Sequence, residues 1–258
     1  MGTNKNKVVT FGEIMVRLGA PGYLKLIQTD KFEVSYAGAE ANVAVSLANY
    51  GVETDYITCL PGNPIAERCI MDLRGHKVGV DHIQRTGKRM GILYLETGSN
   101  ARPSKVYYDR EDSSFATVVP DSIDWKDILK DATWFHWTGI TPALSKNAAS
   151  ECLKAIKTAN ELGITVSCDI NYRANLWKYG KAASEVMPEM VAGSDIILGN
   201  EEDCEKVSYD LFSKSPCAIS SYGPSLCSSV EISHVNCKGH MSRYCKERSC
   251  GSHLEAVA

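Results

Sequence analysis

Thr133–Asp169 reads TWFHWTGITPALSKNAASECLKAIKTANELGITVSCD. The β-rich run Thr133–Trp137 predicts a strand, the apolar period of Lys146–Leu162 predicts a helix, and Ile164–Asp169 predicts a second strand. A strand, a long helix and another strand in succession are typical of a βαβ unit, because parallel strands need a long crossover connection. This stretch therefore predicts a parallel sheet covered by helices.

The same alternation extends in both directions from this unit. Further strands are expected at Val8–Phe11, Asp55–Thr58 and Ser194–Leu198, and further helices at Ala39–Tyr50, Pro64–Arg74 and Ala182–Ala192. In the helix that begins at Ala39, the residues Val43, Leu47 and Tyr50 are predicted to form the apolar stripe. Right-handed crossovers then make a doubly wound α/β sandwich the expected architecture.

Two strand-rich segments interrupt this alternation. They are Met15–Tyr36 and Met90–Asp109, and each contains a Gly/Pro/Asn break. In Lys105–Arg110 polar and aromatic residues occur on both faces of the predicted strand. Such strands suit a small sheet that folds over a polar ligand or pairs with a second subunit, and we call this predicted sheet the lid.

Composition excludes several classes of protein. The chain has 258 residues, of which 44% are hydrophobic and 23% charged, so it is neither disordered nor fibrous. Its 28 Lys and Arg against 31 Asp and Glu give a net charge of −3, which argues against nucleic-acid or membrane-surface partners. No run approaches the roughly 18 apolar residues of a membrane span, and Met1–Asn6 is too polar to open a signal peptide. We therefore expect a cytoplasmic protein.

The ten cysteines fall into two groups. Those of the first group are scattered in apolar or helical settings, which predicts reduced, buried side chains: Cys59, Cys69, Cys152, Cys168 and Cys204. The other five crowd into the Ser-rich segment 208–258. That segment is unlike the rest of the chain.

Small residues before a predicted helix form the first candidate site. Gly38 and Ala39 leave the backbone open to a polyol, and Asn42 lies one turn into the helix beside the same opening. The alternative is a tight strand-to-helix turn with Asn42 merely solvated. On the lid, Arg102, Tyr108 and Arg110 suit a carboxylate or phosphate with hydroxyls, or else form an ordinary solvated face.

Polar residues also follow two predicted strands. Asp169, Asn171 and Arg173 alternate out of the carboxyl end of a strand, where ligands bind in open α/β sheets, although Asp169 and Arg173 could form a structural salt bridge instead. Asn200–Asp203 either caps a helix or supports a magnesium–nucleotide phosphate from the outer shell. His136, between two aromatic residues, is expected to be a packed core histidine.

Taken in order, these motifs resemble the ribokinase-type (PfkB) carbohydrate kinases, and among them the 2-keto-3-deoxygluconate kinases. The resemblance runs from about Lys7 to Val207 and rests on Val9–Met15, Gly38–Asn42, Tyr107–Arg110, Thr138–Leu144, Asp169–Arg173 and Asn200–Asp203. It implies a ribokinase-like fold with a β lid, and transfer of the γ-phosphoryl group of ATP, with Mg²⁺, to a hydroxyl of a sugar acid. It is also compatible with a homodimer formed through the lid.

The resemblance also implies roles for individual residues. Gly38, Ala39 and Asn42 would hold hydroxyls of the sugar acid. The other implied ligand-binding residues are Tyr94, Tyr108 and Arg110 on the lid, Arg173 for the carboxylate, Gly139 and Ile140 as backbone and wall, and Asn200 and Asp203 for phosphate and magnesium. At Asp203 the family usually has Glu, so the side chain here is one methylene shorter.

Segment 208–258 departs from the family. Relatives carry there a Gly-Ala-Gly-Asp motif that supplies an anion hole and the catalytic base, and no such motif occurs in this sequence. We therefore expect a truncated or frame-shifted copy that binds sugar without turnover, with the strand near Asp195–Leu198 left as an unprotected edge. A less favoured alternative is a zinc knuckle formed by Cys237, His240, Cys245 and Cys250.

Overall fold

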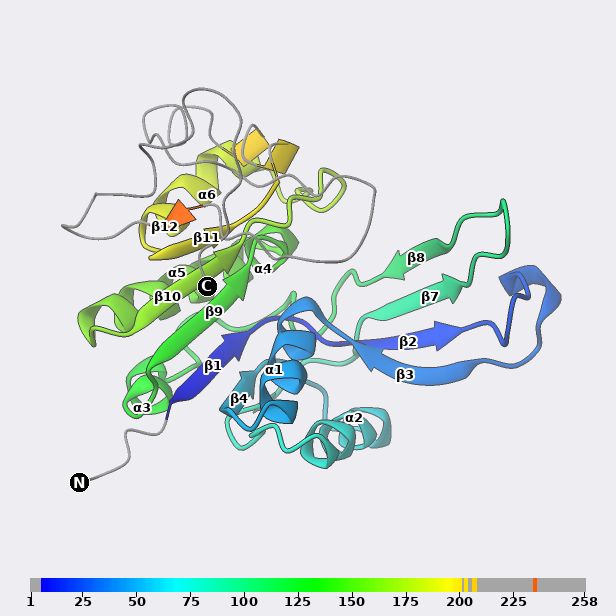
Figure 1. Ribbon diagram of the computed structural model, residues 1–258, viewed down its shortest axis with the longest axis horizontal. Coiled ribbons are helices and arrows are strands. Elements are labelled where there is room, and N and C mark those ends of the chain that lie inside the picture. The colour runs from blue at the N-terminus through cyan, green and yellow to red at the C-terminus, as the bar shows by residue number, and fades with distance from the viewer. Residues whose placement is uncertain (1–5, 201, 204–205, 208–233, 236–258) are drawn as a thin grey trace, which may run out of the picture.

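Alternating strands and helices build a six-stranded sheet (Figure 1). The structure is a computed structural model that describes residues 6–200, 202–203, 206–207 and 234–235. The strand order is β12-β11-β10-β9-β1-β4, and all neighbours are parallel except β11 and β12. The strands are β1 (Lys7–Phe11), β4 (Glu53–Ile57), β9 (Trp134–Thr138), β10 (Thr165–Asp169), β11 (Ile196–Leu198) and β12 (His234–Val235).

The edge at β11 carries a partner strand, so the prediction of an unprotected edge is wrong at these residues. His234 and Val235 pair antiparallel with Ile197 and Ile196. An open edge accepts any extended segment because pairing uses backbone groups rather than particular side chains.

The predicted zinc ligands Cys237, His240, Cys245 and Cys250 lie outside the described residues.

Helices cover both faces of the sheet. On one face, α1 (Ala39–Asn49) and α2 (Pro64–Gly75) enclose a core that includes Tyr56 of β4. On the other face, three helices pack on Val9, Phe135 and other aliphatic and aromatic side chains. These helices are α3 (Trp125–Leu129), α5 (Lys146–Glu161) and α6 (Ala183–Ala192). The expected doubly wound α/β sandwich is therefore confirmed.

The apolar stripe predicted for α1 is wrong. Its buried face consists of Glu40, Ala41, Ala44 and Ala48, whereas Tyr50 is 83% exposed. Small alanine side chains let the helix lie close to β1 and β4, and this close packing outweighs the burial of larger apolar residues. The face that a helix buries can therefore be chosen by size as well as by hydrophobicity.

The lid is a separate four-stranded sheet with the order β3-β2-β7-β8. Its central strands β2 and β7 are parallel, and the outer pairs are antiparallel. Figure 1 shows it projecting from one side of the molecule. Its elements are β2 (Met15–Gly19), η1 (Leu26–Gln28), β3 (Glu33–Ala37), β7 (Ile92–Glu96) and β8 (Lys105–Asp109). The strand-rich segments thus form the expected sheet. A further, separate sheet consists of two parallel strands, β5 (Cys59–Leu60) and β6 (Gln84–Arg85).

Cysteine burial follows the sequence prediction where the structure describes it. Cys59, Cys69, Cys152 and Cys168 are buried, and burial raises the pKa of the Cys59 and Cys69 thiols to about 12. Cys204 lies outside the described residues.

Within the described part of the chain, no helix combines the length and the apolar character needed to cross a membrane.

Candidate functional site

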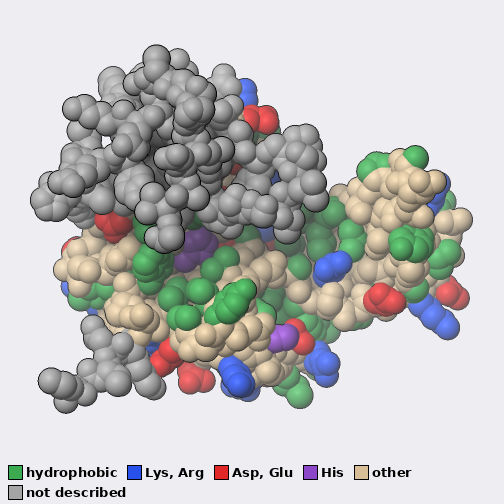
Figure 2. Space-filling view, in the orientation of Figure 1, with side chains coloured by type: hydrophobic (Ala, Val, Ile, Leu, Met, Phe, Trp, Pro, Cys, Tyr) green, Lys and Arg blue, Asp and Glu red, His purple; other side chains and the backbone are tan. Residues whose placement is uncertain are grey.

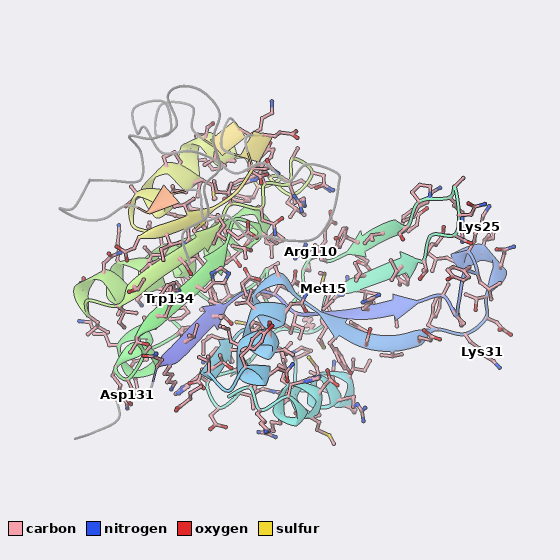
Figure 3. All side chains as sticks on the ribbon, in the orientation of Figure 1. Met15, Lys25, Lys31, Arg110, Asp131 and Trp134 are labelled. Atoms are coloured by element: carbon pink, nitrogen blue, oxygen red, sulfur yellow. The ribbon has the colours of Figure 1, made fainter. Side chains whose placement is uncertain are left out.

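The carboxyl ends of the parallel strands bring most of the predicted residues to one edge of the main sheet. Glu13 follows β1, Gly139 follows β9, and Asp169 ends β10. The short helix α4 (Ile140–Leu144) begins at the same edge. Figure 3 places Met15 and Arg110 at the root of the lid, next to this edge, and Lys25 and Lys31 at its far end.

The turn before α1 is shaped by a close backbone approach. Gly38 is the N-cap residue of α1, and a Cβ atom there would lie 2.3 Å from the carbonyl oxygen of Glu13. Glycine is therefore required by space at this position. Ala39 is half-buried and Asn42 is exposed, so the Asn42 side chain is accessible from solvent. Whether these residues bind a hydroxyl stays a prediction.

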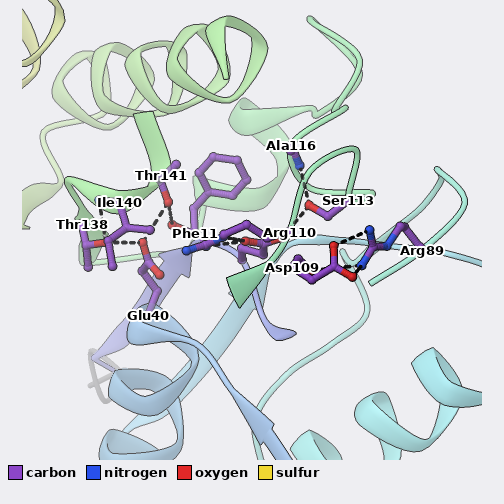
Figure 4. A network of polar contacts seen from close by, with 12 residues as sticks. Phe11, Glu40, Arg89, Asp109, Arg110, Ser113, Ala116, Thr138, Ile140 and Thr141 are labelled. Carbon is purple, nitrogen blue, oxygen red and sulfur yellow. Dashed lines mark hydrogen bonds and ion pairs between the residues drawn. The ribbon is translucent and has the colours of Figure 1, made fainter. Parts of the chain in front are cut away.

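Glu40 is a buried carboxylate that sequence reasoning missed. It is 1% exposed and accepts hydrogen bonds from the hydroxyls of Thr138 at 2.7 Å and Thr141 at 2.9 Å (Figure 4). A Cβ atom on Gly12 would lie 2.1 Å from its carboxyl carbon, so glycine makes the room for this group. Burial raises the pKa of Glu40 to about 7, against the lowering effect of the two hydroxyls. Glu40 thus joins α1 to β9 and α4.

Glu13 is a second buried carboxylate that the prediction did not include. It is 4% exposed, and Arg110 donates to it from Nε at 2.8 Å and from one Nη atom. The hydroxyl of Ser113 donates to its other oxygen. This ion pair ties the start of the lid to the end of β8.

Two predicted lid residues lie together. The guanidinium carbon of Arg110 is 5.6 Å from the ring centre of Tyr108, which is a cation–π contact. Tyr108 is half-exposed, at 52%, so its ring can meet a ligand as well. Tyr94 pairs with Tyr107, the neighbour of Tyr108 along β8. Because successive side chains of a strand point to opposite faces, Tyr94 lies on the other face of the lid, and its ring packs near Phe32 at 6.2 Å.

Arg102 is separated from this pair by the length of β8. Its Nη2 atom donates to the carbonyl oxygens of Tyr23 at 2.6 Å and Thr97 at 3.0 Å. It also lies 4.0 Å from the carboxylate of Glu96. Arg102 therefore stabilises the far end of the lid through these hydrogen bonds, and the structure does not bring it together with Arg110.

Gly139 and Ile140 lie where the main sheet meets α4. The Gly139 amide donates to the carbonyl oxygen of Asp169 at 2.8 Å, and a Cβ atom on Gly139 would be 1.9 Å from the carbonyl oxygen of Ile170. The glycine is therefore needed for the contact between β9 and the loop after β10. Ile140 is half-buried at the same edge, as a wall residue would be.

The loop after β10 carries three of the predicted residues. Asp169 is half-buried, and burial together with the nearby charge of Asp203 raises its pKa. Asn171 has a positive φ of 38°, a conformation that asparagine tolerates better than most residues. Arg173 is exposed and donates to the carbonyl oxygen of Tyr172 at 2.8 Å. Between these two described residues, Asp169 and Arg173, no ion pair forms, so the salt-bridge alternative is wrong.

Asn200 and Asp203 cap each other. The Asn200 side chain accepts from the Asp203 amide at 2.8 Å, and the Asp203 carboxylate accepts from the Asn200 amide at 3.4 Å. This is the reciprocal geometry of a capping box. The same carboxylate accepts from the Tyr172 amide at 3.1 Å, so it also holds the loop after β10. The capping alternative is therefore realised, and the phosphate role stays a prediction.

The Asp169–Asp203 pair is the part of the site that best suits a cation. Each carboxylate keeps lone pairs beyond its backbone bonds. Burial and, after it, the negative charge of Asp203 raise the pKa of Asp169, and a nearby positive charge would act against both effects. No group of three or more His, Cys, Asp or Glu residues that could hold a metal occurs in the described ranges. The pair therefore fits a magnesium ion held mainly by phosphate and water rather than a protein-enclosed metal.

His136 is a packed core histidine, as predicted. It is 7% exposed, and its Nδ1 atom lies 2.8 Å from the hydroxyl of Ser167. Burial lowers its pKa to about 4, so the ring is neutral at physiological pH. It lies within the sheet rather than at the strand ends.

Comparison with known proteins identifies the family. The model of the pfkB family carbohydrate kinase matches residues 5–219. The chain belongs to this family. The motif resemblance stated from the sequence is thereby confirmed.

Individual relatives agree with this assignment. A 2-dehydro-3-deoxygalactonokinase of Haloferax volcanii is 36% identical over 203 residues, which cover 78% of this chain and 63% of that protein. A 2-dehydro-3-deoxygluconokinase of Bacillus subtilis is 29% identical and is covered to 53%. The crystal structure of a 2-dehydro-3-deoxygluconokinase from Thermotoga maritima matches with a TM-score of 0.75 and 47% identity, over 78% of this chain and 62% of that one. This pfkB-family chain thus spans less than two thirds of the length of these relatives.

Two signals in the sequence could have revealed the missed glutamates. Glu13 and Glu40 each stand among apolar or small residues, in TFGEIMV and YAGAEANVA. A charged residue in such a setting is rarely buried unless it is paired or hydrogen-bonded. Each therefore implied a polar partner from elsewhere in the chain, although the sequence did not say which one.

Proposed function

We propose that this pfkB-family chain forms the sugar-acid side of a site of the kind that transfers the γ-phosphoryl group of ATP to 2-keto-3-deoxygluconate, and that its 258 residues bind this sugar acid without turning it over. The observation that supports this proposal is that two groups of residues lie at the carboxyl ends of strands of the main sheet: Arg110 is bonded to Glu13, which follows β1, and Arg173 follows β10. Arg110 and Tyr108 come from the root of the lid, and Arg173 comes from the loop after β10. Two arginines at this edge of the sheet suit a small polyhydroxylated acid. The names of the relatives from Thermotoga maritima and Bacillus subtilis support the gluconate form.

Arg173 is the residue assigned to the substrate carboxylate. Its charge is exposed, and in the described part of the chain it forms no ion pair. The charge of Arg110, by contrast, is compensated by Glu13. Arg110 and Tyr108 therefore offer directed hydrogen bonds to hydroxyl or keto oxygens, and Asn42 and the backbone at Gly38 and Ala39 offer more. Gly139 would present its backbone to the ligand, and Ile140 would form an apolar wall of the site.

ATP and Mg²⁺ belong to the same proposal. Asp169 and Asp203, with Asn200, are the residues that would face the metal and the phosphates. Bound magnesium would supply positive charge to the transferring phosphoryl group. Asn171 would remain beside the sugar acid. The free thiols of the buried residues Cys59, Cys69 and Cys152 are compatible with a cytoplasmic location, where ATP is available.

A homodimer through the lid is the proposed assembly. The lid exposes large apolar side chains at Val34 (60%), Val106 (41%) and Tyr107 (49%). Figure 2 shows hydrophobic side chains on the lid among charged ones of both signs. Exposed apolar strands favour pairing with a second copy. Sedimentation analysis would test this, because Val34→Lys should shift a dimer to monomer.

Calorimetric titration tests the proposed ligand. Arg173→Ala should weaken binding of 2-keto-3-deoxygluconate by about 10- to 100-fold, the scale of a lost charge-assisted hydrogen bond. Binding of a neutral hexose should change little. Arg85→Ala, which removes an exposed arginine that pairs with Glu67, is the matched control. Equal losses for the acid and the neutral sugar would reject the carboxylate role.

A further inference from the structure

The side chain of Glu13 contacts the guanidinium group of Arg110 more than any other described side chain. Among the residues that the structure describes, the Glu13 side chain accepts two bonds from the guanidinium group of Arg110 and a third from Ser113. Figure 4 shows Arg110 and Ser113 near each other in this network of polar contacts. A carboxylate that binds the Nε and one Nη atom fixes the plane of a guanidinium group. The second Nη atom has no hydrogen-bond partner among the described residues, so it is available to a ligand.

The surroundings of Glu13 leave space for this arrangement and for little else. A Cβ atom on Gly91 would lie 2.9 Å from the Glu13 carboxylate and 3.2 Å from the Cβ atom of Arg110. The backbone of Glu13 touches Gly38, the N-cap residue of α1. One residue thus contacts both the lid and the turn that is proposed to hold the sugar hydroxyls.

We infer that Glu13 is a positioning residue, which fixes the guanidinium group of Arg110 at the root of the lid in the orientation that receives the sugar acid. This inference rests on the proposed function. Glu13 itself is 4% exposed and contacts no substrate in this arrangement. Its effect on binding therefore passes through Arg110.

A double-mutant cycle tests this dependence. The variants are Glu13→Gln, Arg110→Gln and the double variant, each titrated with 2-keto-3-deoxygluconate in a calorimeter. Glu13→Gln should weaken binding by about tenfold, and Arg110→Gln by at least as much. In the Arg110→Gln background the change at Glu13 should have no further effect, because coupled residues are not additive. Independent, additive losses would overturn the inference.

Glu151→Gln is the matched structural control. Glu151 is also a buried glutamate, 1% exposed, and accepts a bond from the indole of Trp125 at 3.0 Å. Its replacement should lower the melting temperature and leave the affinity unchanged. If Glu13→Gln does not fold, Ser113→Ala removes one bond to Glu13 and should weaken binding about two- to threefold in the wild-type background only.

A ligand-free measurement separates this inference from the proposed function. In ¹⁵N spectra, the Nε–H signal of Arg110 should be protected from exchange in the wild type and in Glu151→Gln, and should be lost in Glu13→Gln. A wild-type chain that does not bind the sugar acid would refute the proposed function. An Arg110 signal unaffected by Glu13→Gln would refute the positioning role, whatever the chain binds.

Discussion

Replacing Glu40 by Gln should remove a pH dependence from the stability of the chain. Glu40 is buried, and the described partners of its carboxylate are the hydroxyls of Thr138 and Thr141 and backbone amides rather than a cation. Burial raises the pKa of its carboxyl group from 4.5 to about 7. Between these values the folded chain binds a proton more tightly than the unfolded chain. Stability from this group is therefore fully present below about pH 4.5 and is lost as the pH rises through about 7.

The size of the effect follows from the shift. A difference of about 2.5 pKa units corresponds to roughly 3 kcal/mol, of which about 2–3 kcal/mol is lost between pH 5 and pH 8. Gln keeps the acceptor oxygen for Thr138 and Thr141 and cannot ionise. For a domain of this size, that energy corresponds to about 5–10 °C in melting temperature. As the pH rises, the melting temperature of the Glu40→Gln variant should therefore increase by this amount relative to that of the wild type.

Urea denaturation of the two proteins at several pH values measures this difference directly. The free energy of unfolding of the variant minus that of the wild type cancels the other titrating groups, and it should rise by about 2–3 kcal/mol from pH 5 to pH 8. Glu185→Gln, at an exposed helix terminus, is the control for a change of glutamate to glutamine. Parallel curves for the wild type and Glu40→Gln would show that Glu40 does not titrate in this range.

Three further predictions follow from the geometry. Gly139→Ala should destabilise the chain by about 2 kcal/mol or more, because the new Cβ atom would lie 1.9 Å from the carbonyl oxygen of Ile170. Gly75→Ala is the control: this position has open space around it, so the variant should be neutral or stabilising in a thermal melt. Tyr108→Phe should weaken binding of 2-keto-3-deoxygluconate several-fold, and Tyr94→Phe, on the opposite face of the lid, should not; equal effects in titration would contradict this placement. In a coupled assay with ATP and Mg²⁺, the 258-residue chain should show no turnover above blank, since its sequence lacks the Gly-Ala-Gly-Asp motif; clear turnover would mean that another residue acts as the base.

The strands and long helices were predictable because periodicity acts locally. Lys146–Leu162 predicted α5 to within one residue of its observed end at Glu161. The helix α4, Ile140–Leu144, was not predicted, because five residues are too few to show a period. Its position depends instead on the Thr141 hydroxyl, which reaches Glu40 from a distant part of the chain.

Site residues were predictable where they follow a strand, and less so on the lid. Asp169 and Arg173 lie at the sheet edge because the carboxyl ends of parallel strands share it. Arg102 and Arg110 belong to one polar segment of sequence, yet β8 places them about 14 Å or more apart. The partnership of Glu13 with Arg110 spans 97 positions, and no local pattern encodes it.

The parallel pairing of β2 with β7 has a consequence for the order of folding. A hairpin could assemble from neighbouring residues alone, but these two strands are separated in sequence by α1, β4 and α2. Closing so long a loop costs entropy that is recovered only when the intervening segment is already compact. The lid should therefore form after the adjacent helices have docked on the main sheet, and amide hydrogen exchange in β2 and β7 should never be slower than in β1 and β4.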